Sequence, residues 1–555
     1  MVRFLGARQI LYLFLLLTAW AIPSSGSAQT FPPISVVISD SAATQGYYFM
    51  SPYKNIQPIN YDRPLFILDR YGRVVFYRYF AGPMNENGTS DFKIQPDKRM
   101  SYCNISLKKF FLMDSTFVVS DSIDCVNGFE TDMHDFQILP NHHYLMIGKE
   151  TRTMNLSSYH WFGPNHTAPG GVNAEVTGVV IQEFDENKTL VWEWKGHDHY
   201  QFGDVDQVWL SLPNKVDWTH ANAIEQDKDG NILLSLRHFD EITKINHSTG
   251  DIIWRMGGKA NQFTFPNDPI GFTGQHDIRR VSDTSVSLFD NGQYTNPVMA
   301  RAMEYALDEN NKIARKVWEY IYDSSLYSTA CGNHQYLENG NHLVDFGSFG
   351  TGNPWMVVVK PDKTKVMEIS LPDFYFSYRA FNYITLPWQL HRPAVDCEKT
   401  GDVYYLVAEP GHPQYKWSTG ATTASIPITS PGDYWVYVPY GDGTICSEYI
   451  HITDVLNPCL NTTVQPHGIP AEVSLSCMPN PAIDKIRIVI GLPSASEVSV
   501  SLQSLQGVEI SRPLQGSYTA GQHEVTLDVS SFSKGICFLT LTTAECRIVR
   551  KIVLQ

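Results

Sequence analysis

Four segments of the sequence share one pattern: a histidine, a short strand-like run, a turn and a second apolar run. The turns include DKDGN and LENGN, in which Gly and Asn tolerate the positive φ of tight hairpins. Three further segments place a tryptophan after β-branched residues. Such repetition, at roughly 40–60 residues, is typical of β-propeller blades. The repeats begin at His134, His220, His276 and His334, and the tryptophans are Trp192, Trp254 and Trp318.

Two weaker units, 63–80 and 100–122, precede these repeats, so the count predicts six blades. Helical periodicity is nearly absent, which predicts an all-β protein. With 43 % apolar and 12 % aromatic residues, the chain can bury a large core. An array of β-sandwiches is the alternative, although sandwiches seldom repeat a histidine, a hairpin and a tryptophan.

The chain of 555 residues is too long for one ordinary core, and its composition changes along its length. We expect a six-bladed β-propeller, then an Ig-like β-sandwich, and a small C-terminal β-sandwich after a linker. The expected parts are a signal peptide at 1–28, the propeller at 29–392, the Ig-like domain at 393–456, the linker at 457–472 and the last domain at 473–555.

The N-terminus predicts export. Arg3 and Arg8 precede an apolar run, and Gly26 and Ala28 offer a cleavage site. An uncleaved membrane anchor is the alternative, but the apolar run is short for a span. The net charge of −15 argues against nucleic acid or an anionic membrane as the main partner.

An exported chain can form disulfides, and this one has nine cysteines. Shared domains favour two pairs, Cys397 with Cys446 and Cys537 with Cys546. The odd number leaves at least one cysteine unpaired. No CxxC motif occurs, so a structural zinc site is not expected.

If each repeated histidine opens the innermost strand of a blade, the four histidines gather at one end of the central channel. Strand alternation gives Asn222 the same face as His220, and it lets only one of Arg237 and His238 face inward. We favour Arg237. Asp135 and Asp277 directly follow two histidines, and alternation predicts that they point away.

Three interpretations of these polar residues remain open. The histidines could form a structural hydrogen-bond network within the blades. Together with Asn222 and Arg237 they could instead bind an anionic group such as sulfate, phosphate or carboxylate. Converging neutral imidazoles could also hold zinc, copper or iron.

The segments DWTHANAI, DGNILLSLRH, MHDFQILPNHHYLMIG and GQHDIRRV resemble the bacterial arylsulfate sulfotransferases over roughly residues 100–390. Members are six-bladed propellers that move a sulfuryl group between phenols through a sulfated histidine, without a nucleotide sulfate donor. The resemblance implies an aryl sulfate donor, a phenolic acceptor and no cofactor or metal. It implies His276 as nucleophile, with His220, His134, Arg237 and Asn222 around it; further candidates for substrate binding are His334, Arg301 and His238.

The chain departs from the best-known members of that family. We expect it to lack their separate N-terminal β-domain, which helps dimerisation there, and to add two C-terminal domains. Its oligomeric state and substrate range therefore stay open. The rival hypotheses are a non-catalytic surface adhesion protein and a metal-dependent hydrolase or lyase.

The last 80 residues or so resemble the C-terminal sorting domain of the type IX secretion system. The similar segments are MPNPAIDKIRIVI, VSLQSLQGVEI and the closing SKGICFLTLTTAECRIVRKIVLQ. The resemblance implies the type IX machinery as a partner and a secreted or surface-anchored protein. An ordinary β-sandwich appendage is the alternative.

Overall fold

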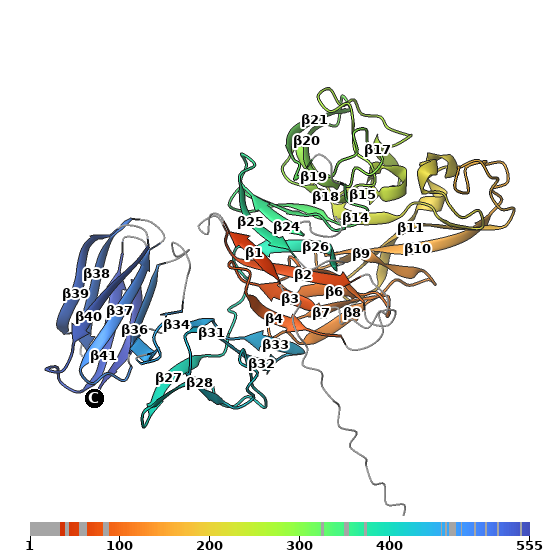
Figure 1. The fold of residues 1–555 in the computed structure, drawn as a ribbon. Helices are drawn as coiled ribbons and strands as arrows, with labels where there is room; N and C mark the ends of the chain where they lie inside the picture. The colour runs from red at the N-terminus through yellow and green to blue at the C-terminus, as the bar shows by residue number, and fades with distance from the viewer. Residues whose placement is uncertain are drawn as a thin grey trace, which may run out of the picture. The chain divides into compact units, whose positions relative to one another are not determined.

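The structure is a computed structural model (Figure 1). The segment expected to be a signal peptide lies outside the residues that it describes. Within the described part of the chain, no helix has the length and apolar character needed to cross a membrane. The described residues are 34–38, 44–54, 64–80, 88–323, 327–348, 355–370, 375–456, 458–460, 463–464, 473–478, 480–492, 495–505, 508–518, 521–543 and 547–555.

Four antiparallel sheets follow one another along the chain, each with four strands in sequence order. The first holds β5 (Thr89–Ile94), β6 (Met100–Asn104), β7 (Lys109–Met113) and β8 (Val119–Ile123). The second holds β9 (Glu130–Ile138), β10 (Tyr144–Met154), β11 (Ala174–Phe184) and β12 (Leu190–Lys195), with β13 (Lys215–Asp217) parallel to β11. The third holds β14 (Ala221–Gln226), β15 (Ile232–Leu236), β16 (Glu241–Ile245) and β17 (Ile252–Gly257). The fourth holds β18 (His276–Arg280), β19 (Ser285–Asp290), β20 (Arg301–Asp308) and β21 (Ile313–Tyr320).

Two more sheets join early strands to late ones. One runs from β26 (Tyr375–Tyr383) through β2 (Tyr47–Lys54) and β3 (Leu65–Leu68) to β4 (Val74–Arg78), with β26 beside β2 in Figure 1. The other runs from β22 (Asn333–Tyr336) through β23 (His342–Asp345), β24 (Met356–Val359) and β25 (Lys365–Ser370) to β1 (Ser35–Ile38). These pairings fasten the two ends of this part of the chain together.

The first strands of these six sheets contact one another in a closed ring. In order they are β26, β5, β9, β14, β18 and β22, and β22 contacts β26 again. Four-stranded antiparallel sheets around a central ring are the architecture of a β-propeller. The predicted all-β propeller class is therefore confirmed.

Hydrophobic cores fill the spaces between neighbouring sheets. One core joins Leu145 and Ile181 of the second sheet to Ile224 and Leu234 of the third, all buried. Each such buried side chain contributes about 1.5–3 kcal/mol. This packing fixes the inner strands, and through them the polar residues at their ends.

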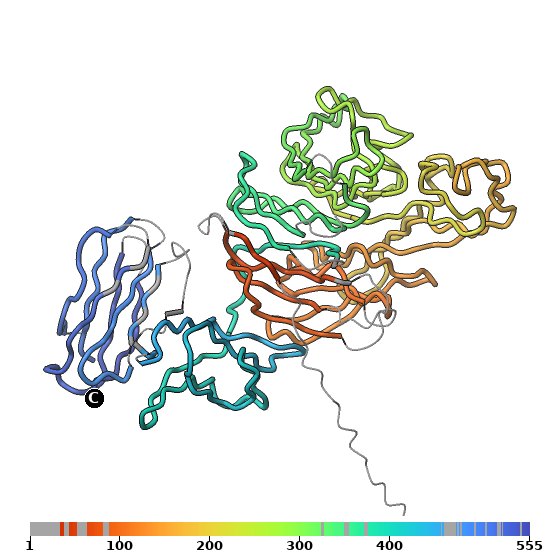
Figure 2. Tube along the Cα trace, in the orientation of Figure 1, coloured from red at the N-terminus to blue at the C-terminus, as the bar shows by residue number. Residues whose placement is uncertain are grey.

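A separate lobe projects from the second sheet. The segment between β10 and β11 lies beside three short 3-10 helices (Figure 2). The ring centroids of Tyr159 and Phe202 are 4.7 Å apart across the two segments. The helices are η1 (Gly196–Asp198), η2 (Phe202–Asp204) and η3 (Gln207–Trp209).

The segment from 395 to 464 forms short strands in three groups. The first is β27 (Val395–Thr400), β28 (Val403–Ala408) and β30 (Ser425–Pro427), and the second is β31 (Gly432–Tyr434), β34 (Ile450–Ile452) and β35 (Thr463–Val464). The third is β29 (Lys416–Trp417), β32 (Val436–Tyr440) and β33 (Gly443–Cys446), and β33 pairs with β4. An Ig-like fold for this segment stays a prediction.

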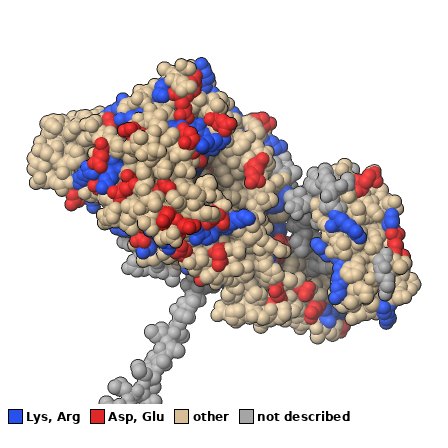
Figure 3. All heavy atoms as spheres, turned by 180° about the vertical axis from the view of Figure 1, so that it is seen from behind, with Lys and Arg blue, Asp and Glu red and all other residues tan. Residues whose placement is uncertain are grey.

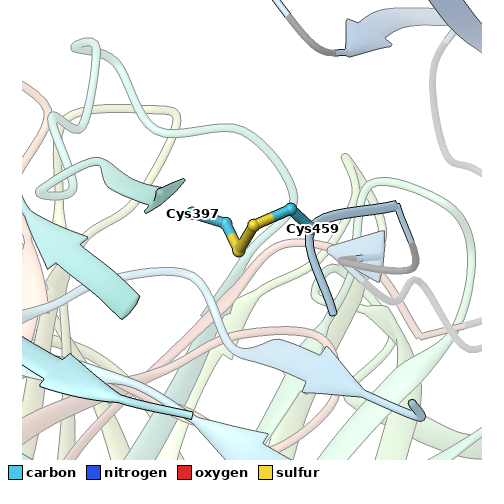
Figure 4. Close-up of a disulfide and its surroundings, with 2 residues drawn as sticks. All are labelled: Cys397 and Cys459. Carbon is cyan, nitrogen blue, oxygen red and sulfur yellow. A yellow bond between two sulfur atoms is a disulfide. The ribbon is translucent and has the colours of Figure 1, made fainter. Parts of the chain in front are cut away.

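The disulfide expected between Cys397 and Cys446 is wrong. Cys397 bonds to Cys459, which lies in η5 (Pro458–Leu460), as Figure 4 shows. Cys446, the last residue of β33, is free and fully buried. Cys537 is also free, so its expected pairing is wrong, and Cys546 lies outside the described residues.

The last part of the chain folds as two small antiparallel sheets around a shared core. The strands are β36 (Ser474–Met478), β37 (Lys485–Leu492) and β40 (Gly521–Asp528) in one sheet, and β39 (Glu509–Tyr518), β38 (Ser496–Ser504), β41 (Gly535–Thr542) and β42 (Arg547–Leu554) in the other.

Acidic and basic side chains lie interspersed on the face of the molecule seen in Figure 3.

Candidate active site

His276 is the first residue of β18 and is almost completely buried. Its Nδ1 lies 2.7 Å from Oδ1 of Asn291 and 3.0 Å from the carbonyl oxygen of Gly274. Both partners only accept hydrogen bonds, so Nδ1 carries the proton and Nε2 keeps a lone pair. The backbone N–H of Cys331 donates to that Nε2, with the two nitrogens 3.3 Å apart. Burial, and then Arg237, lower the pKa of His276 well below 6.5, which keeps the ring neutral.

His220 lies just before β14, and its Nδ1 is 2.5 Å from Oδ2 of Asp217. Burial lowers the pKa of His220, while Asp217 opposes that shift. In turn, against the effect of its burial, His220 together with His238 and Lys149 holds the pKa of the Asp217 carboxyl below its usual range. Asp217 thus orients the imidazole through Nδ1 and would stabilise its protonated form.

His134 forms a similar pair with Asp132, whose other carboxylate oxygen lies 2.8 Å from Nζ of Lys149. Against the effect of burial, His134 and Lys149 lower the pKa of Asp132. The ring centroids of His134 and His220 are 5.1 Å apart. Two imidazoles with carboxylate partners therefore face each other beside the inner strands.

Arg237 supplies a positive charge with no carboxylate partner among the described residues. Its Nη2 donates to the carbonyl oxygen of Thr329 at 2.8 Å, and its Cζ lies 4.1 Å from the ring centroid of Trp209. Its Nε is buried without a hydrogen-bond partner in the described part of the chain. A fixed guanidinium with an unused donor is suited to bind an anion.

The prediction that only one of Arg237 and His238 faces the site is wrong. Strand β15 ends at Leu236, and the chain turns into the 3-10 helix η4 (Arg237–Phe239), so strand alternation no longer applies. His238 Nδ1 donates to the carbonyl oxygen of Asp217 at 2.7 Å, and its ring stacks on His220 at 4.5 Å. Its Nε2 lies 3.2 Å from Nη1 of Arg237.

Asn222 is fully buried and ties the inner strands together. Its Nδ2 donates to the carbonyl oxygen of Gln275 at 2.7 Å, directly before His276. The backbone carbonyl oxygen of Asn222 accepts from Tyr378 Oη at 3.0 Å and from Arg379 Nη2 at 2.8 Å. Asn222 therefore positions the backbone that carries His276.

The expectation that Asp135 and Asp277 point away from the channel is wrong. The inner strands contain register shifts, and Asp277 has a φ of 60°, which breaks simple alternation. Both carboxylates reach Arg379 on β26, at 3.2 Å in each case. They belong to a buried network of three acidic and three basic side chains, here called the six-charge cluster. Its members are Asp91, Lys93, Asp135, Asp277, Arg279 and Arg379.

The six-charge cluster joins β5, β9, β18 and β26, and Asp135 also accepts from the backbone N–H of Ile224 on β14 at 3.0 Å. Beyond it, the other ends of the inner strands surround a cavity of about 560 Å³. Lys93 and Arg279 belong to both the cluster and the lining of that cavity. His220 and His276 lie at the beginnings of β14 and β18, and His134 lies midway along β9, directly before Asp135. The cluster therefore lies between the histidines and this cavity.

His334 is not part of the histidine group, so its expected position is wrong. It is fully buried, with Nε2 2.9 Å from Nδ1 of His342 and its ring stacked on Trp318 at 5.0 Å. Arg301 is likewise withdrawn from the site, because it pairs with Asp290 at 2.8 Å and Asp268 at 3.0 Å.

Sequence reasoning missed three residues that orient the histidines: Asn291, Asp217 and Asp132. Two of them carry a local signal, an aspartate two or three residues before a repeated histidine. Asn291 follows Asp290 in the turn after β19, and Asp290 is held by Arg301. Through Asp290, Arg301 holds the turn that carries Asn291.

One group of side chains has the composition of a metal site. The ligand atoms of Asp217, His220 and His238 lie within 4.8 Å of one another. However, His238 Nδ1 already donates to a backbone oxygen, and its Nε2 faces the Arg237 guanidinium. A cation at this place would be repelled by Arg237, so the surroundings favour an anion.

Fold and site together define a propeller protein in which three histidines lie at or beside the inner strands and Arg237 lies close by in η4. Residues 35–379 match the family model described as Arylsulfotransferase (ASST). This match spans more than half of the chain, which therefore belongs to the arylsulfotransferase family. Residues 476–555 match the secretion system C-terminal sorting domain.

No curated protein matches this chain. Among solved structures, a protein of unknown function from Bacteroides caccae aligns with a TM-score of 0.37 and 11 % identity, over 60 % of this chain and 98 % of its own. Virginiamycin B lyase from Staphylococcus aureus aligns with a TM-score of 0.32 and 10 % identity, over 68 % and 97 %. PorZ from Porphyromonas gingivalis gives 0.28 and 9 %, over 91 % and 81 %. Likeness this weak carries no argument about function.

Proposed function

We propose that the protein transfers a sulfuryl group from an aryl sulfate ester to a phenol, with His276 as the transient carrier. The observation that carries this proposal is the neutral His276, whose Nδ1 is held by Asn291. Its Nε2 lone pair accepts a hydrogen bond from the backbone N–H of Cys331, which an incoming sulfuryl group would have to displace. Arg237, close enough to lower the pKa of His276, offers positive charge for the sulfuryl oxygens. Family membership supports a sulfotransferase of some kind.

In the first half-reaction, Nε2 of His276 attacks the sulfur atom. The N–S bond forms while the S–O bond to the aryl group breaks, and the electron pair leaves on the phenolic oxygen. Phenols have a pKa of about 10, so an aryl oxygen leaves far more readily than an alkyl oxygen. Asn291 and Gly274 accept from Nδ1–H and would share the positive charge that the modified ring gains.

A second imidazole would move the phenolic proton. In its protonated form, His220 would donate a proton to the departing oxygen, with Asp217 stabilising the charged ring. In the second half-reaction, neutral His220 would take the proton of the acceptor phenol. The acceptor oxygen then attacks sulfur, the N–S bond breaks, and His276 regains its lone pair. Arg237 would neutralise the sulfuryl oxygens throughout both steps.

The expected location of this reaction is outside the inner membrane. The sorting domain at 476–555 indicates secretion through its cognate machinery, with placement at the cell surface. Cleavage of a signal peptide near residue 28 and anchoring of the mature protein belong to the proposal.

The test is incubation of the purified protein with 4-nitrophenyl sulfate, with and without phenol, and with and without a chelator. We expect sustained nitrophenol release only when phenol is present, and no effect of the chelator. Release that the chelator abolishes would favour a metal-dependent hydrolase at Asp217, His220 and His238. The absence of turnover with a range of aryl sulfates would favour a binding protein instead.

His276→Asn is the sharpest variant for the covalent step. An asparagine amide can occupy the place of Nδ1 and donate to Asn291, but it has no atom at Nε2. We expect this variant to fold and to release no nitrophenol. Mass spectrometry should find a sulfated His276 peptide in the wild-type protein after donor alone, while the exposed His160→Ala variant should behave as wild type.

A further inference from the structure

The loop between β19 and β20 serves the site at two points. It starts with Asn291, directly after Asp290 at the end of β19, and Asn291 holds Nδ1 of His276. Three residues later, the loop presents Tyr294, whose backbone N–H donates to Thr273 Oγ1 at 3.3 Å. Tyr294 is 47 % exposed, a large value for an aromatic side chain beside so buried a site.

A second element fixes the Tyr294 ring from the other side. Trp209, in η3 of the separate lobe, meets Tyr294 edge-on with ring centroids 4.9 Å apart. The same Trp209 stacks on His238 at 4.8 Å and lies 4.1 Å from Cζ of Arg237. The indole is therefore occupied by contacts that hold the anion-binding groups, whereas about half of the Tyr294 surface stays open.

We propose that Tyr294 is the residue that recognises the aromatic ring of the sulfate ester. Arg237 would hold the sulfuryl oxygens, and the Trp209 contact places an exposed aromatic surface next to that guanidinium. Aromatic pairs contribute attraction beyond buried area, at stacked or edge-on centroid separations like the 4.9 Å seen here. An alkyl sulfate would gain no such contact. This inference rests on the proposed function, because it assumes that an aryl sulfate binds at Arg237.

The test measures binding separately from turnover. In the His276→Asn protein, calorimetry gives the dissociation constants of 4-nitrophenyl sulfate and of inorganic sulfate. We expect Tyr294→Ala to raise the constant for 4-nitrophenyl sulfate by about three- to tenfold and to leave that for sulfate unchanged. Tyr294→Phe should restore aryl binding. Tyr336→Ala is the matched control, because Tyr336 is 48 % exposed and lies at the opposite end of an inner strand.

A second measurement uses the wild-type background. There Tyr294→Ala should raise KM for 4-nitrophenyl sulfate by the same factor, with a smaller change in kcat. Equal weakening of both ligands, or no change in either, would overturn the role of Tyr294 even if the wild-type protein turns over. Failure of the wild-type protein to turn over any aryl sulfate would overturn the proposed function itself.

Discussion

Oδ1 of Asn291 lies 2.7 Å from Nδ1 of His276, and this contact sets the proton on the side of the ring away from Nε2. We expect Asn291→Leu to fold but to lose about tenfold to a hundredfold in kcat, because a buried Nδ1–H would lack its main partner. Single-turnover release of nitrophenol measures the effect. Wild-type rates in this variant would show that Gly274 alone is sufficient.

The pH dependence of the first half-reaction should be unusual for a histidine. Burial and Arg237 keep the pKa of His276 well below 6.5, so its ring stays neutral as the pH falls through that value. At about pH 5.5, a histidine of ordinary pKa would be about nine-tenths protonated and inactive. We expect the nitrophenol burst, whose good leaving group needs little acid assistance, to persist at this pH. A burst that halves near pH 6.5 would contradict the prediction.

Arg237 should be hard to replace. Arg237→Ala removes the cation that faces the sulfuryl oxygens, and we expect about a hundredfold or greater loss in kcat/KM. Arg237→Lys should recover only part of it, because an ammonium cannot keep the planar contact with Trp209 and the bond to Thr329 together. Full recovery with lysine would mean that charge alone is sufficient. Thermal melting is the control, because a large fall in the melting temperature would trace the loss to the missing contacts with Trp209 and Thr329 and not to the missing charge.

Asp345 offers a test of stability against pH. Burial raises the pKa of this carboxyl to about 8, although the N–H of Gly347 opposes the shift. A raised folded pKa means that stability is lost as the pH rises from about 4 towards 8. We expect Asp345→Asn to be more stable than the wild type by about 1–3 kcal/mol at pH 8, with the difference gone near pH 4. Denaturant unfolding at both pH values measures it.

The bond between Cys397 and Cys459 closes a loop with a sequence separation of 62. We expect Cys397→Ser to lower the free energy of unfolding of this part of the chain by about 2–5 kcal/mol. Peptide mapping without reduction should find 397 linked to 459. Recovery of a 397–446 peptide would contradict the structure.

The sequence predicted much of the fold because the repeats are local. A histidine, a Gly-Asn turn and an apolar strand mark each hairpin, and His134, His220 and His276 do meet at one end of the inner strands. His334 shows where this reasoning ends. In β22, Asn333 bonds to Ala380 on β26, while His334 turns towards Trp318 and His342.

Other parts of the site depend on contacts that no local pattern contains. Arg237 and His238 both reach the site because β15 ends at Leu236, before either residue. Asn291 and Tyr294 belong to a loop whose position depends on Arg301. The partner of Cys397 lies in a segment that composition assigned to a linker.

The six-charge cluster affects how ligands could reach the histidines. Its three carboxylates and three cations pack between five inner strands and separate the histidines from the cavity at the other ends of these strands. Under the proposed function, the donor and the acceptor would then both approach from the histidine side of the cluster, one after the other. That order of binding is the one that the proposed transient storage of the sulfuryl group on His276 would require.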